Sequence, residues 1–458
     1  MKKFFLTILF CFRVLLPAAS QDMDSAYIKM IYNKALREQQ SYGWLEELCL
    51  NIGHRLSGSP QAERAVKWAD SLMRSLKFNV TKQECMVPFW SRGPKEQAWI
   101  VSRDNKIEVP ILALGGSVAT PPEGIKAKIA EVKSFDELDA LGKTGQVRGK
   151  IVFFNKVMDP TYINTFEAYG EAVRYRWAGA MRAAQYGAAG VVVRSMTTAI
   201  DDFPHTGSMG YNDTVQKIPA CAISTRAAET LSKFRVGNPD IEFHFVMQPK
   251  SGPDVKSFNV IGEVKGSEKP DEVIVVGGHL DSWDVGHGAH DNGAGCVQAM
   301  EAVHLLKLLG IPLKRTIRVV MFMNEENGGR GGARHAELAK NNKKEKVIAA
   351  IESDAGGHAP RGFGFKGDPV KTEKAMRYKK YFTPYLADLW GPGYGGADIN
   401  HLEDQGTLLI GFRPDSQRYF DYHHSTNDTF DKVHPRELAL GSASIAALIY
   451  LLSEYGVE

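Results

Sequence analysis

Six side chains that can bind a metal or move a proton are concentrated in one short stretch, "GGHLDSWDVGHGAHDNGAG", at residues 277–295. They are His279, Asp281, Asp284, His287, His290 and Asp291. Further acids follow two later apolar runs, "VVMFMNEEN" and "AAIESDAG", and these acids are Glu325, Glu326 and Asp354. A solvated loop explains one such carboxylate, but not acids that repeatedly follow buried strands. Imidazoles and carboxylates without a thiolate suit zinc or a similar divalent ion.

The number of carboxylates indicates two metal ions rather than one. Two dications roughly 3.5 to 4 Å apart repel each other strongly, so they need anionic ligands and a shared carboxylate. Asp291, Glu326 and Asp354, together with a hydroxide, would balance the charge of two divalent ions. A buried site requires such a balance, because an uncompensated charge is costly to bury.

Glu325 and Glu326 are adjacent, and adjacent residues of a regular strand point to opposite faces. Both can enter one site only if the strand ends at about Asn324, and the following "NGG" gives the backbone freedom for this. One glutamate can then bind metal. The other can act as general base towards a water whose pKa zinc lowers to about 7.

Strands that alternate with helices are needed to position these residues. From residue 257 onward, near-continuous Val and Ile runs alternate with helical patterns, as in "DEVIVVGGHLDS", "GAGCVQAMEAVHLLKLLG", "RTIRVVMFMNEENGG", "RGGARHAELAKNN" and "VIAAIESDAGG". This pattern predicts an α/β fold with a mixed, mostly parallel central sheet and helices on both faces. Ligands of such folds bind at the carboxyl ends of the strands.

The rest of the chain divides into segments with different residue patterns. Residues 1–20 have a basic start, an apolar run and small residues before a cut, which predicts a signal peptide and a mature chain from Gln21; a membrane-anchored N-terminus is the rival interpretation. Residues 21–109 form the first part of the host domain: the pattern is helical from Ser25 to about Phe78, with Ser59 and Pro60 starting a second helix, and strand-like around "CMVPFW" and "AWIVS". Residues 110–251 change to short β-runs with one helix at 175–188, which indicates an inserted module. Residues 252–458 resume the host domain.

Composition excludes several classes of protein. The formal charge of +3 falls to about zero once Lys2, Lys3 and Arg13 leave with the signal, which argues against nucleic acid or an anionic membrane as partner. After the signal, no stretch reaches the 18 or more apolar residues of a spanning helix. The mature cysteines are too few and too scattered for a disulfide framework.

The motifs together resemble those of the di-zinc aminopeptidase and glutamate carboxypeptidase family of metallopeptidases. They occur in matching order over nearly the whole mature chain: "HRLSGS", "TPPEGI", "SFDEL", "RGKIV", "PHTG", "KIPACAIS", "GGHLDSWDVG", "ESDAG" and "HHS". The resemblance implies a zinc exopeptidase fold of the phosphorylase/hydrolase-like type. It also implies that residues 110–251 form a protease-associated domain inserted into the catalytic domain.

The same resemblance assigns roles to individual residues and implies two zinc ions per chain. His279 and Asp354 would bind one zinc, Glu326 and His424 the other, and Asp291 would bridge them. Glu325 would be the general base, and Asp281 would orient His279. Where relatives often carry paired aspartates, this chain has Asp291 followed by Asn292. His287 and His290 stand at positions that the family does not use as ligands, so we expect loop or supporting roles.

Other residues are weaker candidates for contact with substrate. His423 precedes His424, and adjacent histidines without context are more often a surface pair than a site. The segment "GYGGADINHL" offers Tyr394, Asp398 and Asn400 for a specificity pocket. The competing interpretation is a loop in which Asp398 caps the next helix.

The sequence therefore predicts an exported zinc exopeptidase that hydrolyses dipeptides or short peptides and is secreted or periplasmic. Aminopeptidase or glutamate-type carboxypeptidase activity on longer peptides is the alternative. A catalytically inactive receptor-like binding protein is a remote alternative, because every proposed ligand and the base are present. A glutaminyl cyclase-like acyl transferase ranks low, because such relatives lack the insert. Small peptides are the expected partners, with no nucleic acid, no membrane after signal cleavage, and a homodimer by family resemblance.

Overall fold

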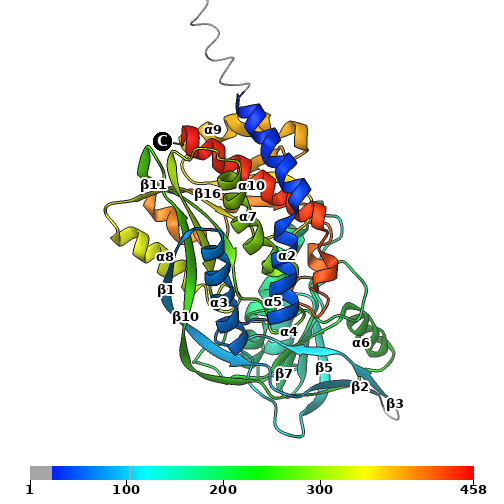
Figure 1. Cartoon of the computed structure of the whole chain (residues 1–458). Coiled ribbons are helices and arrows are strands. Elements are labelled where there is room, and N and C mark those ends of the chain that lie inside the picture. Colours follow the sequence, from blue (N-terminus) through cyan, green and yellow to red (C-terminus); the bar gives the residue numbers. More distant parts are fainter. Residues whose placement is uncertain (1–22, 103–104, 458) are drawn as a thin grey trace, which may run out of the picture.

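The computed structural model describes residues 23–102 and 105–457, and it contains two eight-stranded mixed sheets with helices packed around them (Figure 1). The signal peptide expected over residues 1–20 lies outside the described residues. The first sheet has the order β1-β10-β12-β11-β13-β16-β14-β15. Its strands are β1 (Asn79–Ser91), β10 (Lys250–Val264), β11 (Lys269–His279), β12 (Arg315–Phe322), β13 (Lys346–Glu352), β14 (Pro360–Lys366), β15 (Leu389–Pro392) and β16 (Leu408–Pro414).

The centre of the first sheet is parallel and buried on both faces. Strands β12, β11, β13 and β16 pair in parallel, whereas β1, β10 and β14 add antiparallel pairings. Along β11, Ile274 and Val276 belong to the core on one face, and Val273 and Val275 belong to a separate core on the other. The alternation follows from the two-residue period of a strand. The predicted α/β architecture is therefore confirmed.

Helices cover both faces of this sheet. A helix over residues 23–38 comes first; the other α-helices of this unit are α2 (Gln40–Glu46), α3 (Pro60–Ser75), α7 (Ala294–Leu308), α8 (Arg330–Asn341), α9 (Pro369–Met376) and α10 (Pro435–Tyr455). Shorter helical segments are η1 (Glu47–Ile52), η2 (Ala289–Gly293), η3 (Arg377–Tyr381), η4 (Thr383–Tyr385), η5 (Ile399–Gln405), η6 (Tyr419–Asp421) and η7 (Phe430–Lys432). Ser59 caps α3 as predicted, because its hydroxyl accepts from the N–H of Ala62. By length and composition α10 could cross a membrane, but most of it is buried inside the protein, as in a core helix.

The second sheet, drawn in the lower part of Figure 1, has the order β3-β2-β9-β5-β6-β7-β8-β4. Its strands are β2 (Glu96–Ser102), β3 (Asn105–Val109), β4 (Ile111–Ala113), β5 (Ile125–Val132), β6 (Ile151–Phe154), β7 (Gly190–Arg194), β8 (Ala220–Ile223) and β9 (Glu242–Met247). Strands β5 to β8 are parallel. The sheet itself starts at Glu96, before residue 110 where we predicted the insert to start, because β2 pairs with both β3 and β9.

The expectation of one helix in this segment was wrong. The structure has three, α4 (Phe135–Lys143), α5 (Thr165–Gln185) and α6 (Thr225–Gly237). Ser134 and Ser224 cap α4 and α6 with their hydroxyls. Helix α4 has only nine residues, so its pattern in the sequence is short, and the buried face of α6 consists mainly of small residues, so its apolar periodicity is weak.

The two sheets are joined at one place in the chain and packed at another. The chain passes from the first sheet to the second between β1 and β2, and it returns between β9 and β10. These two crossings are adjacent, because Ser91 at the end of β1 pairs with Lys250 at the start of β10. Away from these crossings, the buried Trp283 indole fits against Gly115, where a Cβ would lie 1.9 Å from the ring. Gly115 therefore allows close contact between the second unit and the loop that follows β11.

Candidate metal centre

The candidate ligands meet at the carboxyl ends of parallel strands, as predicted for this class of fold. His279 is the last residue of β11, Asp354 follows β13 by two residues, and Glu326 follows β12 by four. Asp291 lies in η2, directly before α7. His424 comes from the loop after β16. Segments spread over some 150 residues of sequence therefore supply one cluster.

Asp291 stands at the centre of this cluster. Its Oδ1 lies 3.2 Å from His279 Nε2, which is also 3.2 Å from Asp354 Oδ1. Its Oδ2 lies 3.3 Å from His424 Nε2, which is 3.1 Å from Glu326 Oε2. Each oxygen of one carboxylate thus faces a different histidine and a different second carboxylate. The two oxygens of Asp291 therefore link two separate groups of candidate ligands.

A break in the backbone directs Glu325 and Glu326. Strand β12 ends at Phe322, and Asn324 takes a positive φ of 75°. The predicted end of the strand by Asn324 is confirmed, and Asn324 itself makes the turn ahead of the glycines. The N–H of Trp283 donates to Glu326 Oε1 at 3.1 Å, which leaves Oε2 for His424. Glu325 lines the large cavity described below, where burial and then the carboxylate of Asp354, against the opposing effect of His279, raise its pKa well above the usual range.

The histidines are oriented so that Nε2 faces the cluster. His279 Nδ1 lies 3.0 Å from the carbonyl oxygen of Asp281, and His424 Nδ1 lies 3.2 Å from that of Thr206. A carbonyl accepts only from an N–H, so Nδ1 carries the proton and Nε2 keeps a lone pair for metal. The carboxylate of Asp281 is 3.8 Å from His279 Nδ1, so the group of Asp281 that contacts His279 is its carbonyl.

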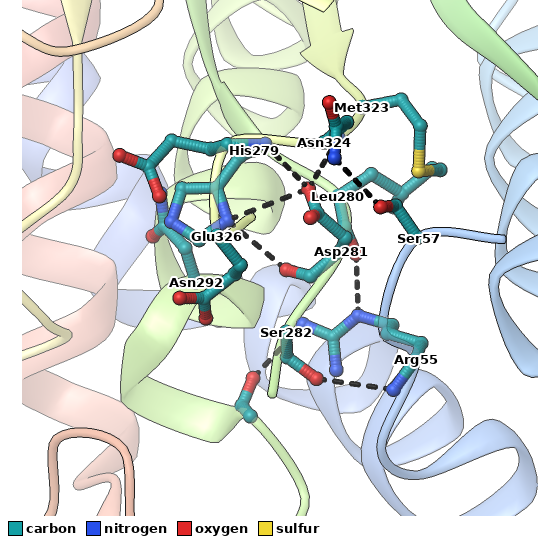
Figure 2. Close-up of polar contacts among 12 residues, drawn as sticks. Arg55, Ser57, His279, Leu280, Asp281, Ser282, Asn292, Met323, Asn324 and Glu326 are labelled. Carbon is teal, nitrogen blue, oxygen red and sulfur yellow. Dashed lines mark hydrogen bonds and ion pairs between the residues drawn. The ribbon is translucent and has the colours of Figure 1, made fainter. Parts of the chain in front are cut away.

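The carboxylate of Asp281 instead holds the segment that carries the two glutamates. Its Oδ1 accepts from the N–H of Asn324 at 2.8 Å (Figure 2). The same oxygen accepts from the N–H of Glu325 at 3.2 Å. The Asn324 side chain donates to Ser57 Oγ at 2.8 Å, and Ser57 donates to Asn327 at 2.7 Å. Two buried side chains from distant segments thus fix the turn on which the candidate base stands.

Arg55 is a supporting residue that its sequence pattern did not reveal, although "HRLSGS" had marked its segment. It is fully buried, and its guanidinium donates to the carbonyls of Leu280 at 2.6 Å, His287 at 2.8 Å and Gly288 at 2.9 Å. Figure 2 shows its bond to Leu280 beside Ser282, whose hydroxyl accepts from the Arg55 N–H at 3.1 Å. One cation therefore holds the carbonyls of the loop between His279 and Asp291.

Asp428 is a second supporting residue that was missed. Its carboxylate accepts from the N–H groups of His290 at 2.8 Å and Asp291 at 3.1 Å, and its carbonyl accepts from His287. Burial raises the pKa of Asp428 to about 7. The only sequence signal was its place four residues after His424. Arg55 and Asp428 bind backbone groups, and the residue types alone do not show which backbone groups they bind.

The remaining side chains of the histidine-rich stretch lie outside the cluster. Asp284 pairs with Arg92 at 2.5 Å. His287 Nδ1 accepts from the N–H of Phe430 at 3.1 Å, and His290 Nδ1 accepts from Gly357 at 3.1 Å. These three residues therefore build the loop, and His279 and Asp291 are the two residues of the stretch that enter the cluster together.

The tentative substrate residues lie in different places. The ring of His423 stacks on His424 at 3.5 Å, and its Nε2 is 3.7 Å from Asp291 Oδ2. Tyr394 is exposed and lines the cavity. Asn400 accepts a hydrogen bond from Lys366 at 2.7 Å and does not line the cavity. Asp398 is buried behind the cavity wall and makes no side-chain cap to η5.

Both units contribute to a cavity of about 1440 Å³ above the cluster. Its lining includes Glu325, Asp354 and His424 from the first unit and Tyr169 and Arg176 of α5 from the second. The Arg176 guanidinium is buried, and its Nη1 lies 3.4 Å from His424 Nδ1. The second unit therefore closes one side of the site and places a positive charge behind a candidate ligand.

The donor set fits zinc. The ligand atoms of His279, Asp291 and Glu326 lie within 4.8 Å of one another, as do those of Asp291, His423 and His424. Within the described part of the chain no hydrogen bond satisfies Asp291 Oδ2, although it is buried in the centre of the cluster. A buried anionic oxygen without a donor is costly unless a cation joins it. Imidazole nitrogen and carboxylate oxygen are common zinc ligands.

Comparison with known proteins agrees with this class of fold. A profile of peptidase family M28 matches residues 259–449. Carboxypeptidase Q of Homo sapiens is 36% identical over 443 residues, which cover 95% of this chain and 90% of the relative, and the Mus musculus protein is 34% identical over 436 residues. The crystal structure of a peptidase M28 precursor from Shewanella amazonensis superposes with a TM-score of 0.89 at 33% identity, covering 94% and 97% of the two chains.

A more distant structure, BSAP, a zinc aminopeptidase from Bacillus subtilis, has a TM-score of 0.64 at 20% identity over 90% of this chain and 94% of that one, which shows the shared fold. The chain belongs to peptidase family M28 and is a zinc-dependent metallopeptidase of the exopeptidase class. The resemblance of its motifs to carboxypeptidase Q, also called plasma glutamate carboxypeptidase, is confirmed.

Proposed function

We propose that the chain is an exported di-zinc exopeptidase whose leading substrates are dipeptides and other short peptides. The observation that carries this proposal is Asp291, whose two oxygens face two separate histidine and carboxylate pairs. His279 and Asp354 would hold one zinc, Glu326 and His424 the other, and Asp291 both.

Bound zinc supplies Lewis-acid polarisation of the scissile carbonyl and lowers the pKa of water. The protein's own residues do the rest. Glu325 takes a proton from the attacking water and delivers it to the leaving amine, so its carboxylate is regenerated at the end of the cycle. The Asp281 carboxylate and Ser57 hold the Glu325 turn, and Arg55 and Asp428 hold the loop before Asp291. These contacts fix the base relative to the ligands before substrate arrives.

Dipeptides are the leading substrate class because relatives carry both carboxypeptidase and aminopeptidase names, and a dipeptide has both ends free at the single bond. The cavity also has room for longer chains. Aminopeptidase or glutamate-type carboxypeptidase activity on longer peptides is therefore the alternative.

The proposal extends to the cellular context of the enzyme. The sequence pattern of residues 1–20 supports export, with a secreted or periplasmic mature protein. The second unit, which closes the cavity through α5, would be a protease-associated domain. A homodimer is proposed from family resemblance, and small peptides are the proposed partners, without nucleic acid or membrane.

A peptide panel tests the proposal. Dipeptides, longer peptides and end-blocked versions of both are incubated with the mature protein, with and without a chelator, and zinc per chain is measured. Cleavage that needs zinc and two free termini supports the dipeptidase. Cleavage of peptides blocked at one end identifies an aminopeptidase or a carboxypeptidase. Two zinc ions without any peptide cleavage would overturn the proposed function.

A further inference from the structure

Arg413 is a cation in the cavity wall that neither the cluster nor the proposed mechanism uses. It lies on β16, which pairs in parallel with β13 in the register Glu352↔Gly411. Continuing that register by two residues places Arg413 level with Asp354, a candidate zinc ligand. Neighbouring strands lie roughly 4.8 Å apart. The residue is therefore attached one strand away from the candidate metal centre.

Within the described residues, the guanidinium of Arg413 has a carbonyl partner but no carboxylate partner. Its Nη2 donates to the carbonyl of Pro392 at 2.6 Å, and no carboxylate lies within ion-pair distance of it in that part of the chain. Arg361, another arginine of the cavity wall, pairs with Asp415 at 2.6 Å. Arg413 is half-buried, so it is a partly desolvated cation without a counter-ion.

Two glycines make the space that the guanidinium occupies. A Cβ on Gly393 would lie 2.0 Å from Arg413 Nη2, and a Cβ on Gly364 would lie 2.7 Å from its Nε and Nη2. A side chain at either place would displace the guanidinium from this position. Burial lowers the pKa of Arg413, as expected for a cation held away from water without an anion. The backbone thus preforms a slot for a charge that the described residues do not neutralise.

We propose that Arg413 is a specificity residue that binds a carboxylate of the peptide substrate. This inference rests on the proposed peptidase function and adds the substrate's charge to it. Arginine presents a planar fork of donors that matches the two oxygens of a carboxylate. The carboxylate can belong to the C-terminus of a short peptide or to an acidic side chain. Either carboxylate would make the same ion pair with Arg413, and pairs of substrates that differ in one carboxylate can distinguish the two sources.

The test compares Arg413→Gln, which removes the charge, with Arg413→Lys, which keeps a charge and a donor without the fork. Arg361→Gln is the matched control, because it removes an arginine of the same cavity that already has a partner. Zinc content and melting temperature of each variant show that it is folded and loaded. The substrates are two pairs: a peptide and its C-terminal amide, and a Glu-containing peptide and its Gln counterpart.

We expect Arg413→Gln to lower kcat/KM roughly ten- to a hundredfold for the carboxylate member of one pair and to leave the neutral member unchanged. Arg413→Lys should recover part of the loss, and Arg361→Gln should match the wild type. A loss confined to the first pair identifies the C-terminal carboxylate, and a loss confined to the second identifies an acidic side chain. Equal effects on both members of both pairs would overturn the proposal. Wild-type protein that cleaves neither pair, whatever its zinc content, would instead refute the peptidase function.

Discussion

The two sheets of the molecule are built alike, yet they differ in the polar residues at the ends of their parallel strands. In the second sheet, Asn155 after β6 donates to Glu131 and accepts from Arg194, and Ser224 after β8 caps α6. These polar groups find partners within their own unit. In the first sheet, Asp291, Glu326 and Asp354 meet one another and two histidines, and a buried oxygen of Asp291 stays without a hydrogen bond.

The comparison teaches where chemistry can reside in a fold of this kind. A strand end whose polar groups are satisfied within the protein stabilises the fold, and one that gathers unsatisfied charge needs a ligand. The second unit takes part in the site in another way, through the side of α5 that carries Tyr169 and Arg176. Variants of matched chemistry in the two sheets can therefore separate function from stability.

The largest effect is expected for the candidate base. Glu325→Gln should keep both zinc ions and lower turnover by roughly two to four orders of magnitude, because the amide cannot accept the proton. Steady-state kinetics with zinc analysis measures this. Glu131→Gln, which changes a carboxylate of the second sheet held by Asn155, Ser232 and Arg235, should lower stability and leave turnover close to wild type. Near-normal activity of Glu325→Gln would refute the assignment.

The next effect concerns the shared carboxylate. Asp291→Asn should lower the affinity for at least one zinc by roughly a hundredfold or more, because an amide offers one neutral oxygen where two metals need anionic ones. Equilibrium dialysis followed by elemental analysis gives zinc per chain. Asp284→Asn is the control, since Asp284 lies in the same loop and pairs with Arg92. Retention of two tightly bound zinc ions by Asp291→Asn would contradict the bridging geometry.

A smaller effect is expected from Arg55→Lys. Lysine lacks the fork that holds three carbonyls of the loop, so we expect zinc affinity to fall roughly ten- to a hundredfold through the loss of preorganisation. Competition with a chromophoric chelator measures the affinity. Arg194→Lys changes an equally buried arginine of the second sheet and should lower the melting temperature without changing zinc affinity. If both variants lose only stability, Arg55 is structural alone.

The smallest effect is the pH dependence of stability that arises from His335, a residue outside the candidate metal centre. Burial lowers the pKa of His335 from 6.5 to about 3, so the folded state keeps this ring neutral while the unfolded chain takes up a proton. Between these two values the unfolded state binds more protons, so stability rises with pH and is lost on acidification. We expect the zinc-free protein to lose about 2 kcal/mol from this group between pH 7 and 5. His335→Gln should show a shallower loss in denaturant titrations, and an unchanged slope would contradict the assignment.

The sequence was sufficient to predict the parallel core and the residues that now lie together, because strand ends and ligand types leave a direct pattern. It was not sufficient for Arg55 and Asp428, which hold backbone groups and therefore carry no characteristic spacing. The contact between the Asp281 carbonyl and His279 could not be predicted for the same reason, because it involves a backbone group. Helix α4 was missed because its nine residues give too short a pattern, and α6 was missed because its buried residues are mostly small.

The pairing of β1 with β10 bears on how the chain folds. The two strands form a long antiparallel ribbon, and the whole second sheet is the connection between them. Closing a flexible loop of ~160 residues costs more conformational entropy than closing a short one, and non-local pairings form slowly. If the second unit folds first, its ends at β2 and β9, which are paired strands, come together and the loop becomes short. We therefore expect the inserted unit to fold early and to act as the turn on which the catalytic sheet assembles.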